Sequence, residues 1–219
     1  MNRFYVTLGV VAVACAAGLF YLLQPEPAAS TAAAAAPVAV VDDGFRGYTA
    51  GSDSAPVEVT EYGDFECPAC ATFATVQMPT IREQLIATGR VRWRYRDFPL
   101  AIHPYSRYAA HAAQCAGEQG KFWEMHDQLF GHHQWAQTGK NPAGLFRDLA
   151  KAVGVDAARY DACMESGRYA SRIEFSRQEG EQRRVDGTPT FYVNGAKFAG
   201  RYTSDAIKAV VDSLAARRK

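Results

Sequence analysis

Two cysteines separated by two residues, in Cys67-Pro68-Ala69-Cys70, are the strongest candidates for chemistry in this sequence. The thiolate form of cysteine attacks disulfides, and the start of a helix stabilises a thiolate through its dipole and its free N–H groups. If a helix begins at this motif, Cys67 is the expected nucleophile and Cys70, one turn further on, is the resolving thiol. Such a pair exchanges its disulfide with the thiols of other proteins.

A Cys-x-x-Cys motif also occurs in zinc sites, haem sites and structural disulfides. Zinc needs further ligands at suitable spacing, but Cys115 and Cys163 are isolated and His132 and His133 are adjacent. A c-type haem needs a histidine after the second cysteine, where Ala71 stands. We therefore expect a redox pair with no metal or cofactor. A structural disulfide and a Cu(I) site, which soft thiolates suit, remain open alternatives.

Strand and helix patterns alternate around the motif. Residues 57–62 and 91–95 are rich in β-branched and aromatic residues, and residues 67–88 between them have helical character with a possible bend at Pro79. This order predicts a β-α-β unit with parallel strands. The segment of about 103–185 that follows is mainly helical.

The strand pattern returns at residues 190–193, and Asn194-Gly195 before residues 196–198 predicts a hairpin. A last helix begins near a cap at Ser204. The whole order predicts an α/β domain in which helices flank one mixed sheet. The dithiol then lies just beyond the carboxyl end of the first strand, where open α/β sheets place their sites.

The segment from Tyr62 to Cys70 and the segment Gly187-Thr188-Pro189-Thr190 together resemble the thioredoxin superfamily. With the helical block between them, the chain is similar to the DsbA-like exported thiol oxidoreductases over roughly residues 56–216. The resemblance implies a thioredoxin-like fold with an α-helical domain inserted between its βαβ and ββα halves.

The resemblance also implies the roles of three further residues. Pro189 matches the cis-proline that faces the dithiol, and Thr188 matches the residue that pairs with the substrate backbone and tunes the thiolate. Glu61 matches a buried carboxylate that exchanges protons with the inner thiol. Asp64 and Glu66 are expected to be solvated turn residues, and His103 is expected to have a capping or packing role.

Cys115 and Cys163 both lie in the helical block. Two leftover thiols in an oxidising compartment invite pairing, and some members of the family carry a second, structural disulfide in this region. We therefore predict a Cys115–Cys163 disulfide, with two separately buried thiols as the alternative.

Residues 4–23 form an uncharged apolar run that follows Arg3, and a run of this length can span a bilayer. No lysine or arginine occurs between Arg3 and Arg46, so the positive-inside rule places the N-terminus in the cytoplasm and the domain outside it. We expect residues 1–23 to be an inner-membrane anchor, with a cleaved signal as the alternative. The Ala- and Pro-rich residues 24–45 predict a linker, and residues 46–219 predict a periplasmic or otherwise extracytoplasmic domain.

The net charge of +1, with cations scattered among acidic residues, gives no basic surface for nucleic acid. The resemblance implies a protein that introduces disulfides into unfolded or reduced client proteins. A quinone-linked membrane re-oxidase of the DsbB or VKOR type would restore the Cys67–Cys70 disulfide. Because sequence does not set the reduction potential, a membrane-tethered disulfide reductase, for example in cytochrome c maturation, is an alternative. A non-enzymatic metal-binding module is the third possibility.

Overall fold

The computed structural model describes residues 39–217, so the predicted anchor at residues 4–23 lies outside the described residues. None of the helices within residues 39–217 combines the length and the apolar character needed to cross a membrane. A five-stranded sheet of order β1-β3-β2-β4-β5 forms the centre of the fold. Its strands are β1 (Tyr48–Ala50), β2 (Val57–Gly63), β3 (Val91–Asp97), β4 (Thr190–Val193) and β5 (Ala196–Lys197).

The predicted mixed α/β sheet is confirmed. Strands β2 and β3 are parallel, and every other neighbouring pair is antiparallel. The predicted hairpin connects β4 to β5, where Asn194 and Gly195 have φ of 45° and 82°. Both residues of such a turn need positive φ, which asparagine and glycine adopt most readily. The edge strand β1 was not predicted from the sequence.

One continuous helical segment connects β2 to β3, as the sequence predicts. It consists of α2 (Pro68–Thr72), η1 (Phe73–Gln77), α3 (Met78–Ile81) and η2 (Arg82–Ile86). The η1 and η2 turns are π-helical. Pro79 lies in the first turn of α3, directly after the widened η1 turn. Proline has no N–H for the helix interior, so a wider turn before it lets the helix continue.

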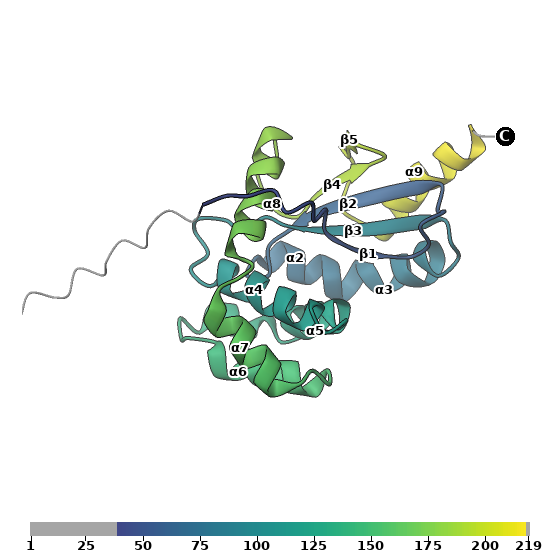
Figure 1. The fold of residues 1–219 in the computed structure, drawn as a ribbon. Coiled ribbons are helices and arrows are strands. Elements are labelled where there is room, and N and C mark those ends of the chain that lie inside the picture. The colour runs from purple at the N-terminus through teal and green to yellow at the C-terminus, as the bar shows by residue number, and fades with distance from the viewer. Residues whose placement is uncertain (1–38, 218–219) are drawn as a thin grey trace, which may run out of the picture. The chain divides into compact units, whose positions relative to one another are not determined.

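The predicted helical insertion lies between β3 and β4. Its elements are α4 (Ser106–Gly117), α5 (Phe122–Gly131), η3 (His133–Gln137), α6 (Ala143–Ala152), α7 (Ala157–Ser166) and α8 (Ala170–Gln182). In Figure 1, α6 and α7 lie farthest from the sheet and α8 returns to it. Gly180 of α8 packs so closely that a Cβ there would lie 2.6 Å from the ring of Phe98.

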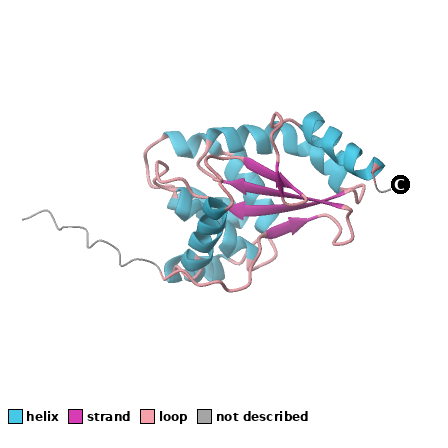
Figure 2. Ribbon diagram, turned by 90° about the horizontal axis from the view of Figure 1, so that it is seen from above, coloured by secondary structure: helices cyan, strands magenta, loops and turns pink. Residues whose placement is uncertain are grey.

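The last helix, α9 (Ser204–Ala216), is capped by Thr203, whose hydroxyl accepts a hydrogen bond from Ala206 N at 3.3 Å. The cap therefore lies one residue before the predicted Ser204. Figure 2 shows the strands as one twisted sheet with helices running along its side.

The two largest of three apolar clusters position the dithiol. The first joins one face of the sheet to the α2–η2 segment and α9, with Phe73, Trp93 and Phe191 packed ring against ring. The second lies under the helical insertion and includes Cys67 and Cys70. The dithiol therefore lies where the insertion meets the thioredoxin-like part of the fold.

The chain before β1 contacts α8. Val41 N donates to Ser171 Oγ at 2.8 Å, and the Arg172 guanidinium pairs with Asp43 and covers the ring of Phe45. Contacts of the folded unit therefore begin a few residues before the predicted boundary at residue 46.

Candidate active site

Cys67 lies at the start of α2, immediately beyond the carboxyl end of β2. It is the N-cap residue, with extended backbone angles, and Pro68 occupies the first helical turn. Proline is favoured there because the first N–H groups of a helix have no intrahelical partner. The Cys67 N–H donates to Asp64 O at 3.1 Å, which closes the turn between strand and helix. The sulfur of Cys67 therefore lies near the free N–H groups of a helix start.

The two thiols have different environments. Both are free in this structure, but Cys67 is 6% exposed whereas Cys70 is fully buried. A hydrogen bond from the Cys70 thiol, followed by contacts with Thr188 and the backbone N–H groups, lowers the pKa of Cys67 to about 5 despite its burial. Burial, followed by the nearby Cys67, raises the pKa of Cys70 well above its ordinary value. These shifts favour the thiolate form of Cys67 and the protonated thiol form of Cys70.

The peptide bond between Thr188 and Pro189 is cis and lies directly before β4. Pairing of Thr190 with Tyr62 brings this loop to the carboxyl end of β2. The neutral Cys67 thiol donates to the Thr188 carbonyl oxygen at 3.3 Å. Thr188 Oγ1 is buried without a hydrogen-bond partner among the described residues, so it is available to donate to a Cys67 thiolate.

Glu61 lies in β2 and is 2% exposed. Its Oε2 accepts a hydrogen bond from Trp93 Nε1 at 3.0 Å, and its Oε1 has no partner within residues 39–217. Burial raises the pKa of Glu61 to about 7. The carboxylate is close enough to Cys70 for its charge to raise the pKa of that thiol. The two groups can thus influence each other's protonation.

The prediction that Asp64 and Glu66 are solvated was wrong. They are 1% and 5% exposed, because both carboxylates bind groups at the start of the helical insertion. Asp64 Oδ2 lies 2.7 Å from His103 Nδ1, so His103 contacts the turn before the dithiol. Glu66 Oε2 accepts a hydrogen bond from Tyr105 N at 2.7 Å. Sequence reasoning missed these contacts because the partners lie far along the chain.

The sequence assigns no role to His133 in η3, yet this side chain lies near the site. Burial lowers its pKa, while the Glu66 backbone and the charge of Cys67 oppose that effect. Its Nε2 is buried without a partner among the residues that the structure describes.

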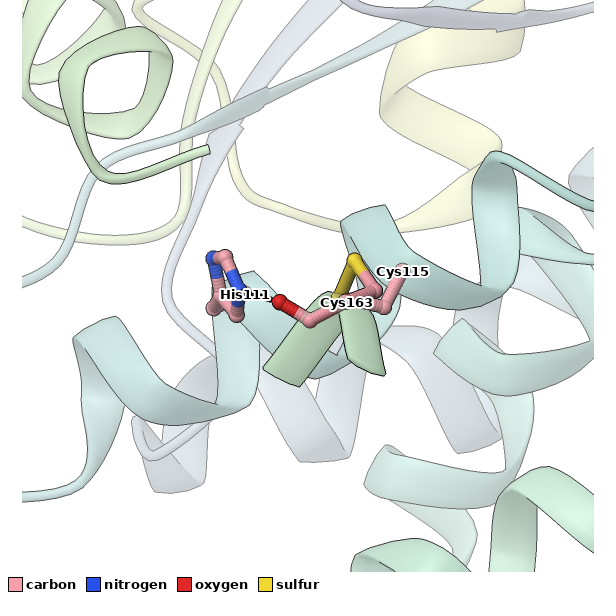
Figure 3. A group of neighbouring side chains, drawn as sticks. All are labelled: His111, Cys115 and Cys163. Atoms are coloured by element: carbon pink, nitrogen blue, oxygen red, sulfur yellow. Dashed lines mark hydrogen bonds between the residues drawn. A yellow bond between two sulfur atoms is a disulfide. The ribbon is translucent and has the colours of Figure 1, made fainter. Parts of the chain in front are cut away.

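Cys115 in α4 and Cys163 in α7 form a disulfide, with their Cα atoms 5.7 Å apart and a sequence separation of 48. His111 Nε2 lies 3.1 Å from the carbonyl oxygen of Cys163 beside this bond (Figure 3). The three side chains are close enough together to hold a metal ion. Because the two sulfurs are bonded to each other, however, this group lacks the thiolates that such a site would need.

Comparison with known proteins defines the class of the chain. A family model described as Thioredoxin matches residues 46–213, so the chain belongs to the thioredoxin family. The structure of oxidised BdbD from Bacillus subtilis is similar, with a TM-score of 0.69 and 28% identity, over 76% of this chain and 91% of that one. These matches confirm the family predicted from the sequence, that of the DsbA-like thiol–disulfide oxidoreductases.

Two curated relatives differ in how much of their length is matched. The Probable disulfide bond formation protein D of Bacillus cereus is 29% identical over 149 residues, which is 66% of this chain and 68% of that protein. The Na(+)/H(+) antiporter NhaA 3 of Salinispora tropica is 41% identical over 172 residues, which is 78% of this chain. This stretch is only 25% of the antiporter, so the chain spans about a quarter of that relative's length.

Proposed function

We propose that this protein introduces disulfides into client proteins by thiol–disulfide exchange at Cys67 and Cys70. The observation that carries the proposal is the contrast between the two thiols: the pKa of Cys67 is lowered to about 5, and that of Cys70 is raised. A stabilised thiolate favours the reduced form of the pair, and this makes its disulfide a better electron acceptor. Clients would therefore be oxidised.

In the proposed reaction, a client thiolate attacks the Cys67 sulfur of the Cys67–Cys70 disulfide. The bond between the two enzyme sulfurs breaks, and its electron pair moves to Cys70. Because the pKa of Cys70 is high, this sulfur takes up a proton, which Glu61 with its pKa of about 7 can supply. The client's second thiolate then attacks the client sulfur of the mixed disulfide, and Cys67 leaves as a thiolate. The client has lost two electrons and the enzyme has gained them.

Thr188 and Pro189 belong to the proposed client-binding site. Their loop contacts Cys67 directly, through the Thr188 carbonyl oxygen at 3.3 Å. The Thr188 hydroxyl has no hydrogen-bond partner within residues 39–217, so it can stabilise the Cys67 thiolate that leaves. A client bound at this loop would present its sulfur beside Cys67.

The proposed location is outside the cytoplasm. The Cys115–Cys163 disulfide supports it, because structural disulfides persist in oxidising compartments. The apolar residues 4–23 after Arg3 support an inner-membrane anchor with the domain in the periplasm or an equivalent space. A quinone-linked membrane enzyme of the DsbB or VKOR type would remove the two electrons and regenerate the disulfide. Unfolded or reduced proteins would be the clients.

Refolding of a reduced, unfolded ribonuclease tests the activity. The full chain carrying Cys15→Ala is the reference, because its thiol count then reports the folded domain, and Cys67→Ala is compared in the same background. We expect the reference protein to restore ribonuclease activity and Cys67→Ala to restore none above the uncatalysed rate. Equal rates from the two proteins would reject exchange through Cys67.

Equilibration of the same reference protein with glutathione buffers separates the oxidase from the reductase. An oxidase is expected above about −200 mV, whereas a reductase resembles thioredoxin at about −270 mV. A reduction potential near that of thioredoxin would overturn the proposed direction of electron flow and favour the membrane-tethered reductase.

A further inference from the structure

Helix α4, the first helix of the insertion, is not capped by the side chain of its own N-cap residue. Its N-cap residue, Tyr105, makes no capping hydrogen bond with its side chain. The Tyr105 N–H donates instead to Glu66 Oε2 at 2.7 Å. A carboxylate at a helix start satisfies free N–H groups and lies at the positive end of the helix dipole. The residue next to Cys67 therefore supplies the cap of a helix that lies 39 residues further along the chain.

Asp64 extends this connection. Its buried carboxylate accepts hydrogen bonds from Glu66 N at 2.8 Å, Leu100 N at 2.9 Å and Ser106 Oγ at 2.5 Å, and it also contacts His103. The turn that leads into the dithiol is thus attached at several points to residues 100–106. A movement of this turn would be transmitted to the start of the insertion.

The Glu66 carboxylate forms no ion pair within the part of the chain that the structure describes. Within residues 39–217, no lysine, arginine or histidine side chain lies within ion-pair distance of Glu66. His103 is the one such side chain within that distance of Asp64 in the same range. Burial raises the pKa of Glu66, while the hydrogen bond from Tyr105, and after it the charge of His103, oppose that effect. Backbone N–H groups and the dipole of α4 are therefore the main stabilisers of this carboxylate. A second negative charge nearby would weaken its position.

We propose that Glu66 is a positioning residue that couples the redox state of Cys67 to the attachment of the helical insertion. The inference rests on the proposed function, in which reduction leaves a thiolate on Cys67. Because Glu66 directly precedes Cys67 in the chain, a thiolate on Cys67 would oppose the negative charge of the Glu66 carboxylate and weaken the cap of α4. Coupling between two sites is reciprocal, so the capping carboxylate disfavours the thiolate by the same factor. The insertion is held more firmly in the oxidised form, and its first turn loosens after a client has been oxidised.

Amide hydrogen exchange of the full chain carrying Cys15→Ala tests the coupling without a variant at the site. We expect the Tyr105 amide to exchange at least threefold faster in the reduced protein than in the oxidised protein at pH 7. Equal rates in the two redox states would overturn the proposal. Local opening of a helix start is the event that such exchange reports.

Glu66→Gln separates charge from capping, because a glutamine oxygen can still accept the Tyr105 N–H. We expect this variant to lose the redox dependence of Tyr105 exchange. The equilibrium constant for reduction of its Cys67–Cys70 disulfide by glutathione should rise at least threefold. A tenfold change in this constant corresponds to about 30 mV in reduction potential. Glu165→Gln, at an exposed position on α7, is the matched control and should change neither measurement.

The outcomes distinguish this inference from the proposed function. If the reference protein does not form a Cys67–Cys70 disulfide with glutathione, the proposed function fails. If it does, and Glu66→Gln matches Glu165→Gln within twofold in both measurements, only the role of Glu66 is rejected. Glu66→Ala, which removes both charge and cap, should speed Tyr105 exchange in both redox states. A purely structural role would produce that effect without the shift of the glutathione equilibrium in Glu66→Gln.

Discussion

Ionised Glu61 should destabilise the folded protein by an amount that depends on pH. Burial raises the pKa of this carboxyl to about 7 from its ordinary value of 4.5. At about 1.4 kcal/mol per pH unit, the ionised form costs the folded state about 3 kcal/mol. Between these two pH values the folded state binds more protons at Glu61 than the unfolded state does. Stability from the protonated form is therefore fully present below pH 4.5 and lost as the pH rises through about 7.

Glu61→Gln removes the ionisation and keeps the geometry. The glutamine carbonyl oxygen can accept the Trp93 Nε1–H that Glu61 Oε2 now accepts at 3.0 Å. Both proteins would be prepared in the full chain with Cys67 and Cys70 replaced by alanine, so that neither redox thiol titrates. This background is suitable because burial, the Trp93 hydrogen bond and Arg82 are the causes of the Glu61 shift, and neither cysteine is among them.

Urea unfolding at pH 4.5 and at pH 8 is the measurement. We expect the two proteins to differ little at the lower pH, and Glu61→Gln to be more stable by about 3 kcal/mol at the higher pH. Other titrating groups cancel in this comparison, since only residue 61 differs. A difference that stays constant within about 1 kcal/mol between the two pH values would refute the raised pKa and, with it, the proposed proton exchange with Cys70.

Two further predictions concern the replacement of cysteines by alanine. Cys70→Ala should raise the pKa of Cys67 above its value of about 5, because the hydrogen bond from Cys70 is the largest cause of that low value. Thiolate absorbance near 240 nm follows the titration, and an unchanged midpoint would assign the effect to the helix start and Thr188 alone. Replacing Cys115 and Cys163 by alanine opens a link across 48 residues and should cost about 4 kcal/mol in the free energy of unfolding. A loss below about 1 kcal/mol in urea unfolding would contradict this loop-entropy argument.

The sequence predicts the position of the dithiol well because its signals are local. Proline after Cys67 favours a helix start, and the alternating pattern before it favours a strand, so the motif lies at a strand-to-helix turn. The hairpin at Asn194 is predicted for the same reason, since two adjacent residues determine the turn. None of these predictions requires knowledge of distant contacts.

The features that sequence reasoning missed depend on contacts between distant segments. Strand β1 has three residues and exists because Tyr48 pairs with Tyr95, which no local pattern records. Asp64 and Glu66 lie in a turn and are charged, which is typical of solvated residues. They are buried because the N–H groups of Leu100 and Tyr105, in the segment that follows β3 in the chain, donate hydrogen bonds to their carboxylates.

In the proposed reaction, Glu61 would add reactivity to the site while its ionised form makes the fold less stable. A glutamine or leucine at position 61 would avoid the cost of an ionised carboxylate, yet neither could carry a proton. Efficient proton transfer requires a group whose pKa lies near the working pH, and burial gives Glu61 a pKa of about 7. Cys70 is fully buried and must gain or lose a proton in every cycle, so a nearby carrier is needed where water is excluded. If Glu61 has this role, Glu61→Gln should slow formation or reduction of the Cys67–Cys70 disulfide and should make the domain more stable at pH 8. A Glu61→Gln variant that gains stability with no loss of rate would show that the carboxylate is dispensable.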